Sequence, residues 1–195
     1  MALTPAIFLD KDGTVLEDVP YNVDPEKMVL APGAAQGLQR LSKLGVPLLV
    51  VSNQPGVALD KFDLPALQTM QARLHTLFLD VGATLGGFYY CPHHAEGTVD
   101  AYRRRCLCRK PAPGLLLSAA VQQDVDLSRS WMIGDILHDV EAGRRAGCTT
   151  VLIDNGNETE WVMDTPWRHP HHRVPDLEAA SRIIVSQFRQ HEAAA

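Results

Sequence analysis

Short apolar runs alternate along the chain with stretches in which apolar residues recur every three or four positions. Val46–Val51 is an unbroken apolar run, which is typical of a strand covered on both faces. Gly33–Leu44 has helical spacing instead, with Pro32 near its start and Gly45 at its end. The first pattern predicts strands at Ala6–Leu9, Val46–Val51, Leu85–Tyr90, Trp131–Ile133 and Thr149–Ile153. The second predicts helices at Gly33–Leu44, Asp63 to about Val81, Pro113–Val125, His138–Ala146 and Asp176–Gln190.

This alternation predicts an α/β fold. Strands that take turns with helices favour a three-layer, Rossmann-like parallel sheet with helices on both faces. The strand-like stretch Arg173-Val174 would close one edge of that sheet. The chain has no internal repeat and no low-complexity linker, so residues 1–195 are expected to form a single domain.

Composition and charge narrow the class of protein. The chain is 46% hydrophobic, which excludes a disordered chain, and its apolar runs are too short for a membrane span. Its 18 Lys and Arg against 23 Asp and Glu give a net charge of −5, which argues against nucleic-acid and anionic-membrane binding. Met1–Pro5 carries no basic signal region, so we expect a cytoplasmic protein, and we expect it to be a monomer.

Polar residues follow three of the predicted strands. Asp10-Lys11-Asp12-Gly13-Thr14 follows the first, Ser52-Asn53-Gln54 the second and Gly134-Asp135 the fourth. Ligands of parallel sheets bind beyond the carboxyl ends of the strands, and neighbouring strands lie roughly 4.8 Å apart. We therefore expect these side chains to meet in one small cavity.

The chemistry of this set points to phosphoryl transfer. Clustered carboxylates repel one another unless a divalent cation lies between them, and an oxygen-rich site suits Mg²⁺. Ser52 offers a neutral donor, Lys110 a compact positive charge, and Gly13 lets backbone N–H groups approach an anion. Alone, Asp10-Lys11-Asp12-Gly13 is equally typical of a turn, so the interpretation depends on the whole set.

Four segments in order resemble the motifs of the haloacid dehalogenase superfamily. The first is Phe8–Thr14, and the second is Val50–Gln54, with Ser52 where many members carry Thr. Arg109-Lys110-Pro111 resembles the third motif, and Ile133-Gly134-Asp135 with Asp139 resembles the fourth. The resemblance spans residues 6 to about 147 and implies the fold of that superfamily.

The resemblance also implies roles for these residues. Asp10 would attack phosphorus and form an aspartyl-phosphate, and Asp12 would act as general acid and then general base. Mg²⁺ would be held by the Asp10 carboxylate, the Asp12 backbone carbonyl and Asp135, while Ser52 and Lys110 hold the phosphoryl oxygens. The second aspartate is typical of phosphatases in the superfamily, since its dehalogenases usually lack that acid.

A second metal site is predicted in the loop 91–108. Cys91-x-His93 and Cys106-x-Cys108 enclose 12 residues, 94 to 105. Three thiolates and one imidazole make a closed tetrahedral Zn²⁺ site, which is structural because no position is open. His94 is a weaker alternative to His93. Three ordinary buried cysteines, or a zinc knuckle that binds nucleic acid, are the competing interpretations, and the knuckle is disfavoured by the net charge and the few aromatic residues nearby.

Zinc-loop members of the superfamily include phosphatases of a heptose bisphosphate and of histidinol phosphate. Gly87–His94 and Cys106–Leu116 are more similar to those acting on the sugar bisphosphate, in the synthesis of bacterial surface polysaccharide precursors. Arg109 would bind the remote phosphate, because the guanidinium fork matches its oxygens. Asp18 would suit sugar hydroxyls or the cationic end of histidinol phosphate, so both substrates stay open. The residues expected to bind substrate are Asp18, Tyr21, Asn53, Gln54 and Arg109.

Spacing predicts an enzyme without a cap domain. Only 39 residues separate Asp12 from Ser52 and 57 separate Ser52 from Lys110, too few for a cap domain of ordinary size. A phospho-acceptor signalling module, similar to a response-regulator receiver, is the alternative from another class. Receivers have the acid pair before the phosphorylated aspartate and lack a zinc loop, so the order of residues here favours the phosphatase.

Two further groups of residues are interpreted as structural. The three histidines at 169, 171 and 172 are expected in a surface turn, since Pro170 interrupts them. Trp131, Trp161 and Trp167 are expected to be packing residues rather than platforms for a substrate.

Overall fold

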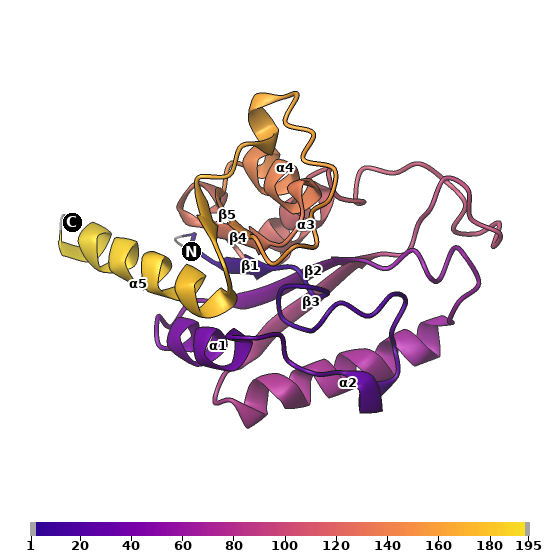
Figure 1. The fold of residues 1–195 in the computed structure, drawn as a ribbon, viewed down its shortest axis with the longest axis horizontal. Helices are drawn as coiled ribbons and strands as arrows, with labels where there is room; N and C mark the ends of the chain where they lie inside the picture. Colours follow the sequence, from indigo (N-terminus) through magenta and orange to yellow (C-terminus); the bar gives the residue numbers. More distant parts are fainter. Residues whose placement is uncertain (1–2, 194–195) are drawn as a thin grey trace.

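The computed structural model describes residues 3–193 and contains one sheet of six strands. The strands are β1 (Ile7–Leu9), β2 (Leu48–Asn53), β3 (Leu85–Cys91), β4 (Trp131–Gly134), β5 (Thr149–Ile153) and β6 (His172–Val174). Every neighbouring pair is parallel, in the order β3-β2-β1-β4-β5-β6. The chain therefore winds outward from β1 in both directions, and the carboxyl ends of β1, β2 and β4 lie side by side (Figure 1).

Helices cover both faces of the sheet, as predicted (Figure 1). One face packs against α1 (Ala34–Ser42), α2 (Leu64–Asp80) and α5 (Leu177–Ala193). The other packs against α3 (Gly114–Gln122) and α4 (Leu137–Ala146). Three short 3-10 helices complete the described elements: η1 (Pro25–Lys27), η2 (Leu127–Arg129) and η3 (Pro166–Arg168).

Alternate residues of the central strand enter opposite cores. Ile7 and Leu9 belong to the core beneath α1, α2 and α5, whereas Phe8 belongs to the core beneath α3 and α4. All three side chains are fully buried. Burial of such a side chain contributes about 1.5–3 kcal/mol relative to exposure, which is why β1 is apolar at every position.

Residues typical of helix ends begin and end two of the helices. Asp63 caps α2 by accepting a hydrogen bond from the backbone N–H of Ala66 at 2.8 Å. Gly147 ends α4 with a φ of 89°, a left-handed conformation that glycine adopts without strain. Strand β5 has the bounds predicted from its apolar run, and the other strands and the helices differ by a few residues.

One expectation for the second half of the chain, that of a surface turn at the three histidines, is only partly right. His172 lies in β6 and stacks on Trp131 with ring centroids 5.8 Å apart, so only part of the histidine segment is a turn. His171 contacts Thr150 and Arg144, which ties that segment to β5 and α4. Trp131 is buried, whereas Trp161 and Trp167 are 36% and 45% exposed.

The connections between strands leave no room for a cap domain. The β1–β2 connection holds only η1 and α1, and the β2–β3 connection holds only α2. The carboxyl edge of the sheet is therefore covered by loops, including the loop 91–108 (Figure 1). Among residues 3–193, no helix is long and apolar enough to cross a membrane.

Candidate active site

The carboxyl ends of the central strands meet around a hollow of about 190 Å³. We call it the acidic hollow. Its lining residues are Asp10, Asp12, Asp18, Ser52, Asn53, Lys110, Asp135, Ile136 and Asn157. The structure thus brings together the five side chains on which the sequence argument depends. Three of the residues expected to bind substrate, Tyr21, Gln54 and Arg109, are not among those that line it.

Lys110 links the nucleophile candidate to a second carboxylate. Its Nζ donates to Asp10 Oδ1 at 2.5 Å and to the Val51 carbonyl at 2.9 Å, and lies 2.6 Å from Asp139 Oδ1. Burial by itself would lower the pKa of Lys110, but the charges of Asp10 and Asp139 raise that pKa above its usual range. Two hydrogen bonds and a second ion pair therefore hold the ammonium in place.

Three buried carboxylates share this single ammonium. One oxygen each of Asp10, Asp135 and Asp139 lies within 4.8 Å of the others. Burial, together with the charges of Asp10 and Asp139, raises the pKa of Asp135 to about 8. Burial likewise raises the pKa of Asp139 to about 6, although Lys110 opposes the shift. This excess of negative charge on oxygen donors fits a divalent cation.

Asp12 lies beside this group but has its own partners. Its Oδ1 is 2.7 Å from the buried Lys11 ammonium, and its Oδ2 accepts from Gln54 Nε2 at 3.4 Å. Gln54 also donates to Ser52 Oγ at 2.8 Å and is itself buried, so it connects two residues that line the hollow without lining it. Burial raises the pKa of Asp12 to about 6; Lys11 opposes this shift and Asp10 adds to it. A carboxyl with this pKa is suited to proton transfer near neutral pH.

Asn53 connects two of the motifs. Its side chain donates to the Lys110 carbonyl at 3.1 Å and accepts from the Lys110 backbone N–H at 3.0 Å. The paired bonds hold Lys110 against the end of β2. Arg109, the preceding residue, is half-buried, and its Nη1 lies 3.5 Å from the His93 carbonyl. Tyr21 is 49% exposed.

Sequence reasoning missed the residues that follow β5. Asn157 Nδ2 donates to Asp135 Oδ2 at 2.8 Å, and Asn155 Nδ2 donates to the Gly13 carbonyl at 2.8 Å. Thr14 Oγ1 lies 3.3 Å from the other oxygen of Asp135. The signal was available, because Asn155-Gly156-Asn157 follows a predicted strand at its carboxyl end, as Asp10 and Asp135 do.

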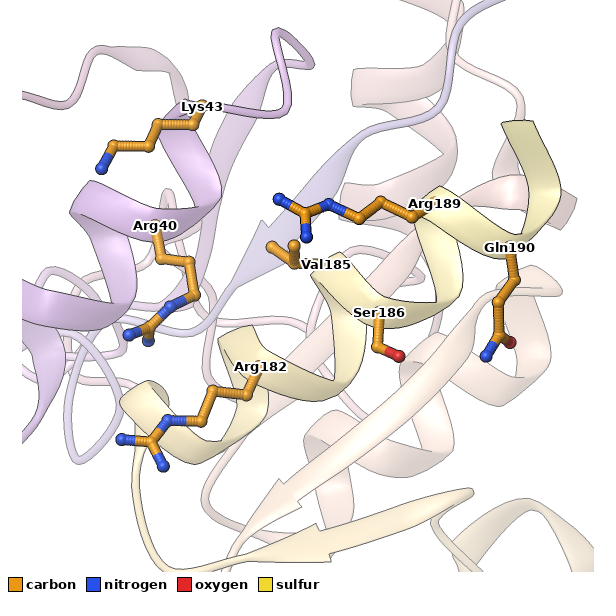
Figure 2. A pocket seen from close by; sticks show the side chains of 7 residues that line it. All are labelled: Arg40, Lys43, Arg182, Val185, Ser186, Arg189 and Gln190. Carbon is orange, nitrogen blue, oxygen red and sulfur yellow. The ribbon is translucent and has the colours of Figure 1, made fainter. Parts of the chain in front are cut away.

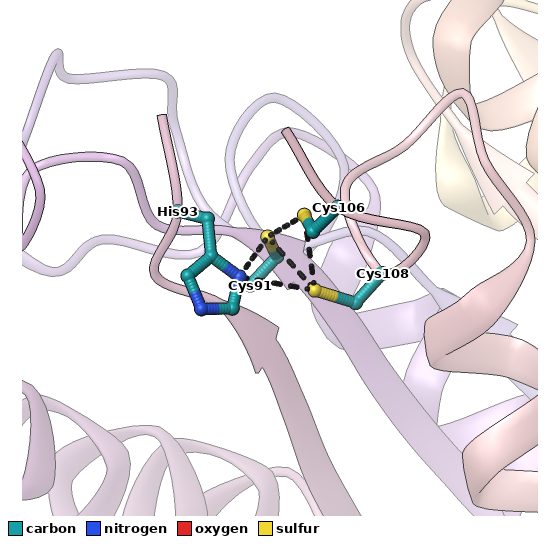
Figure 3. Close-up of side chains that lie close together, drawn as sticks. All are labelled: Cys91, His93, Cys106 and Cys108. Atoms are coloured by element: carbon teal, nitrogen blue, oxygen red, sulfur yellow. Dashed lines mark hydrogen bonds between the residues drawn. The ribbon is translucent and has the colours of Figure 1, made fainter. Parts of the chain in front are cut away.

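Side chains from two ends of the loop 91–108 form a second cluster (Figure 3). The Sγ atoms of Cys91, Cys106 and Cys108 lie 3.2–3.4 Å from one another, and all three are free thiols. His93 Nδ1 lies 3.6 Å from Cys91 Sγ and 3.3 Å from Cys108 Sγ. Tetrahedral bonds of about 2.3 Å to zinc separate sulfurs by about 3.8 Å. The four atoms therefore form a compact ligand set, which needs only a small outward shift of the sulfurs to hold a cation of this size.

The surroundings of this cluster distinguish the two histidines. His94 accepts from the Glu96 backbone N–H at 3.2 Å and lies outside the cluster. Burial, followed by the charge of Arg104, lowers the pKa of His93, which keeps the imidazole neutral as a metal ligand must be. Cys148, the fourth cysteine, is buried and is not part of the cluster.

A second hollow, of about 690 Å³, lies between α1 and α5 (Figure 2). Arg40 and Arg182, which line it, both contact Glu178, at 3.5 and 2.6 Å. Its other lining residues are Lys43, Val185, Ser186, Arg189 and Gln190. None of the lining residues is a carboxylate, a histidine or a cysteine, so this hollow holds no metal-ligand set and no residue of the four motifs.

Comparison with known proteins agrees with this geometry. A family model described as HAD-hydrolase-like matches residues 107–180. The D-glycero-beta-D-manno-heptose-1,7-bisphosphate 7-phosphatase of Escherichia coli K12 is 38% identical over 170 residues, which cover 83% of this chain and 89% of that protein. The enzyme of the same name from Vibrio cholerae is 37% identical over 153 residues, covering 78% of this chain and 82% of that protein.

Solved structures show the same architecture. The D,D-heptose 1,7-bisphosphate phosphatase from B. bronchiseptica, complexed with magnesium and phosphate, superposes with a TM-score of 0.76 and is 27% identical. The match covers 94% of this chain and 99% of that one. Fold and motifs thus define a HAD-like hydrolase, a phosphatase of the haloacid dehalogenase superfamily. Within that superfamily, the chain belongs to the family of the D-glycero-beta-D-manno-heptose-1,7-bisphosphate 7-phosphatases.

Proposed function

We propose that this protein is a Mg²⁺-dependent phosphomonoesterase that removes the 7-phosphate of D-glycero-D-manno-heptose 1,7-bisphosphate. The observation that carries the proposal is the position of Asp10, which lies at the end of β1 in the acidic hollow with Lys110 on its Oδ1 and Asp12 two residues away. The names of the relatives support the sugar bisphosphate over histidinol phosphate. We further propose that residues 1–195 act as a single domain, as a monomer and in the cytoplasm.

The donor set of the acidic hollow fits magnesium. The residues that would hold it are Asp10 and Asp135, through their carboxylates, and Asp12, through its backbone carbonyl. Bound there, the ion would neutralise the clustered carboxylates and act as a Lewis acid on the phosphoryl oxygens. Asp139 is fully buried and lies against Lys110, so we propose that it is the partner of the lysine and not a ligand of the cation.

The first step transfers the phosphoryl group to the protein. Asp10 attacks phosphorus with one carboxylate oxygen, and the bond from phosphorus to the sugar oxygen breaks. Asp12 gives its proton to the departing alkoxide, so the sugar leaves as a neutral alcohol. Ser52 donates to an equatorial phosphoryl oxygen, and Lys110 limits the repulsion between the Asp10 carboxylate and the anionic ester.

The second step releases inorganic phosphate. Asp12, now ionised, takes a proton from a water molecule that attacks the phosphorus of the aspartyl-phosphate. The acyl–phosphate bond breaks, which regenerates the Asp10 carboxylate and the protonated form of Asp12. One residue thus acts as acid and then as base, and its pKa of about 6 suits both tasks.

We assign the cysteine and histidine cluster to structural Zn²⁺. Cys91 ends β3, while Cys106 and Cys108 immediately precede Arg109 and Lys110. A cation held by all four ligands would fix the loop 91–108 to the sheet and so fix the third motif at the acidic hollow. We infer that Arg109, which directly precedes Lys110, binds the remote phosphate of the substrate through its guanidinium.

The substrate is tested by comparing kcat/KM with Mg²⁺ for four compounds: both anomers of the heptose 1,7-bisphosphate, histidinol phosphate and fructose 1,6-bisphosphate. We expect one heptose anomer to give the highest value. A higher value for histidinol phosphate would overturn the substrate. The variant Asp10→Asn serves as the control, because it should fold and bind yet release no phosphate; phosphate release by this variant would overturn the nucleophile.

A further inference from the structure

Asp135 is held by hydrogen-bond donors on both of its oxygens. Asn157 Nδ2 donates to Oδ2 at 2.8 Å, and Thr14 Oγ1 lies 3.3 Å from Oδ1. A carboxylate can only accept, so the amide of Asn157 must present its NH₂ group to it. Two contacts therefore determine the rotation of the Asp135 carboxylate, and the contact with Asn157 is the shorter of the two.

Gly13 lies close against this contact. A Cβ atom built on Gly13 would lie 2.1 Å from Asp135 Oδ2 and 2.4 Å from Asn157 Nδ2. Gly13 itself has a φ of 79° and its carbonyl accepts from Asn155 at 2.8 Å. The backbone of the first motif, the Asp135 carboxylate and the Asn157 amide thus lie close together.

The segment that carries Asn157 is fastened to the same part of the fold. Glu158, the next residue, accepts from the backbone N–H of Leu137 at 2.7 Å, at the first turn of α4. Its other carboxylate oxygen accepts from the backbone N–H groups of Glu160 and Trp161. The segment 155–158 is therefore hydrogen-bonded both to the first motif, at Gly13, and to the start of α4, at Leu137.

We propose that Asn157 is the positioning residue of the acidic hollow: it orients the Asp135 carboxylate for the divalent cation and thereby sets how tightly the cation binds. The inference rests on the proposed function, since it takes Asp135 as a cation ligand. Partners of metal ligands of this kind typically change metal affinity by about 10–100-fold when they are removed. Asn157 and Asp135 both line the hollow, so Asn157 acts on a ligand at the cation site itself.

The test uses Mn²⁺ as the probe, titrated into the zinc-loaded protein and followed by the paramagnetic resonance signal of the free ion. We expect Asn157→Ala to raise the dissociation constant for Mn²⁺ about 10-fold or more. At saturating Mg²⁺, kcat should change by less than about 3-fold, because the reacting groups are intact. The matched control is Asn155→Ala, which removes a neighbouring amide whose bond goes to a backbone carbonyl.

The possible outcomes separate the inference from the proposed function. Unchanged Mn²⁺ affinity in Asn157→Ala, or equal weakening in Asn155→Ala, would overturn the role of Asn157. Weaker binding in Asn157→Ala alone supports it, even if the wild-type protein proves inactive on heptose bisphosphate. Loss of kcat at saturating Mg²⁺ with unchanged affinity would also contradict the role, since it would place Asn157 in the chemical step.

Discussion

Lys110 Nζ lies 2.5 Å from Asp10 Oδ1, a contact that joins residues 100 positions apart in the sequence. The same ammonium lies 2.6 Å from Asp139 Oδ1, and both Lys110 and Asp139 are buried. Lys110 is thus the counterion of two carboxylates, that of the proposed nucleophile Asp10 and that of Asp139, which is inaccessible to solvent. Its removal should affect folding as well as chemistry.

We expect Lys110→Ala to lower the free energy of unfolding by about 3–5 kcal/mol, because it leaves a buried carboxylate without a counterion. The double variant Lys110→Ala/Asp139→Asn should recover a large part of this loss, since the stranded charge is gone. Urea unfolding in Mg²⁺-free buffer with zinc retained measures both. Losses that simply add in the double variant would contradict the pairing.

The raised pKa of Asp135, about 8 against an unfolded value of 3.8, predicts how stability varies with pH when Mg²⁺ is absent. The folded protein holds this proton more tightly, so the stabilising contribution is complete below pH 3.8 and is lost as pH rises towards 8. The slope for one such group is at most about 1.4 kcal/mol per pH unit. We expect Asp135→Asn to remove this loss between pH 5 and 8, measured by urea unfolding.

The wild-type protein and Asp135→Asn are compared at each pH, so that any pH dependence contributed by the cysteine cluster is common to both and cancels in the difference. Added Mg²⁺ should restore the stability of the wild-type protein at pH 8 and leave Asp135→Asn almost unaffected. An identical pH dependence in the two proteins would show that Asp135 is not the group responsible.

The centre of the sheet was predictable because β1, β2, β4 and β5 are largely buried on both faces. Such strands are rich in apolar residues, and Thr149–Ile153 was located with its correct bounds. Exposure of single residues was less predictable. The sequence did not indicate how deeply Trp161 and Trp167 are buried. They belong to the segment between β5 and β6, which packs on α4 and leaves both rings partly in solvent.

The site was predictable as far as residues follow strands. Asp10, Ser52 and Asp135 were found in this way, because the carboxyl ends of parallel strands share one edge. Asn157 follows β5 and obeys the same rule, but a lone amide carries no recognisable chemistry in a sequence. The partner of Asp139 could not be inferred, since the contact with Lys110 depends on how α4 packs beside the third motif and not on any local pattern.

Asp12→Asn should slow phosphate release from an alkyl ester by about 10²–10⁴-fold, the usual contribution of general acid–base catalysis. An aryl ester such as p-nitrophenyl phosphate needs no proton on its leaving group, so its first step should survive. We therefore expect a burst of about one p-nitrophenolate per protein, followed by slow turnover, in stopped-flow absorbance. Equal losses for both esters with no burst would contradict the role of Asp12.

The pKa of Asp12 also predicts the direction in which kcat/KM changes with pH. The first step needs the protonated carboxyl, so kcat/KM for alkyl esters should fall as pH rises above about 6, by up to tenfold per unit. The aryl ester should lack this decline. A decline shared by both esters would assign it to another group.

Cys106→Ala should abolish zinc binding, because a structural site needs all four ligands. We expect about one zinc per chain in the wild-type protein and close to none in the variant by elemental analysis. The melting temperature should fall by about 5 °C or more. Cys148→Ala is the matched control, since Cys148 is buried outside the cluster and should keep its zinc. Unchanged stability and kinetics in Cys106→Ala would contradict a structural role.

Arg109→Ala tests the recognition of the remote phosphate. Hydrogen bonds to a charged group contribute about 1.5–3 kcal/mol, so KM for the heptose 1,7-bisphosphate should rise about 10- to 100-fold. KM for the heptose 7-phosphate, which lacks the remote group, should change by less than about 3-fold. Arg103→Ala is the control, because Arg103 is exposed and paired with Asp100 at 2.5 Å, and it should affect neither substrate. Since Arg109 directly precedes Lys110, a rise shared equally by the two substrates would mean that the substitution displaces the third motif, and the remote phosphate would then have to be bound by another residue.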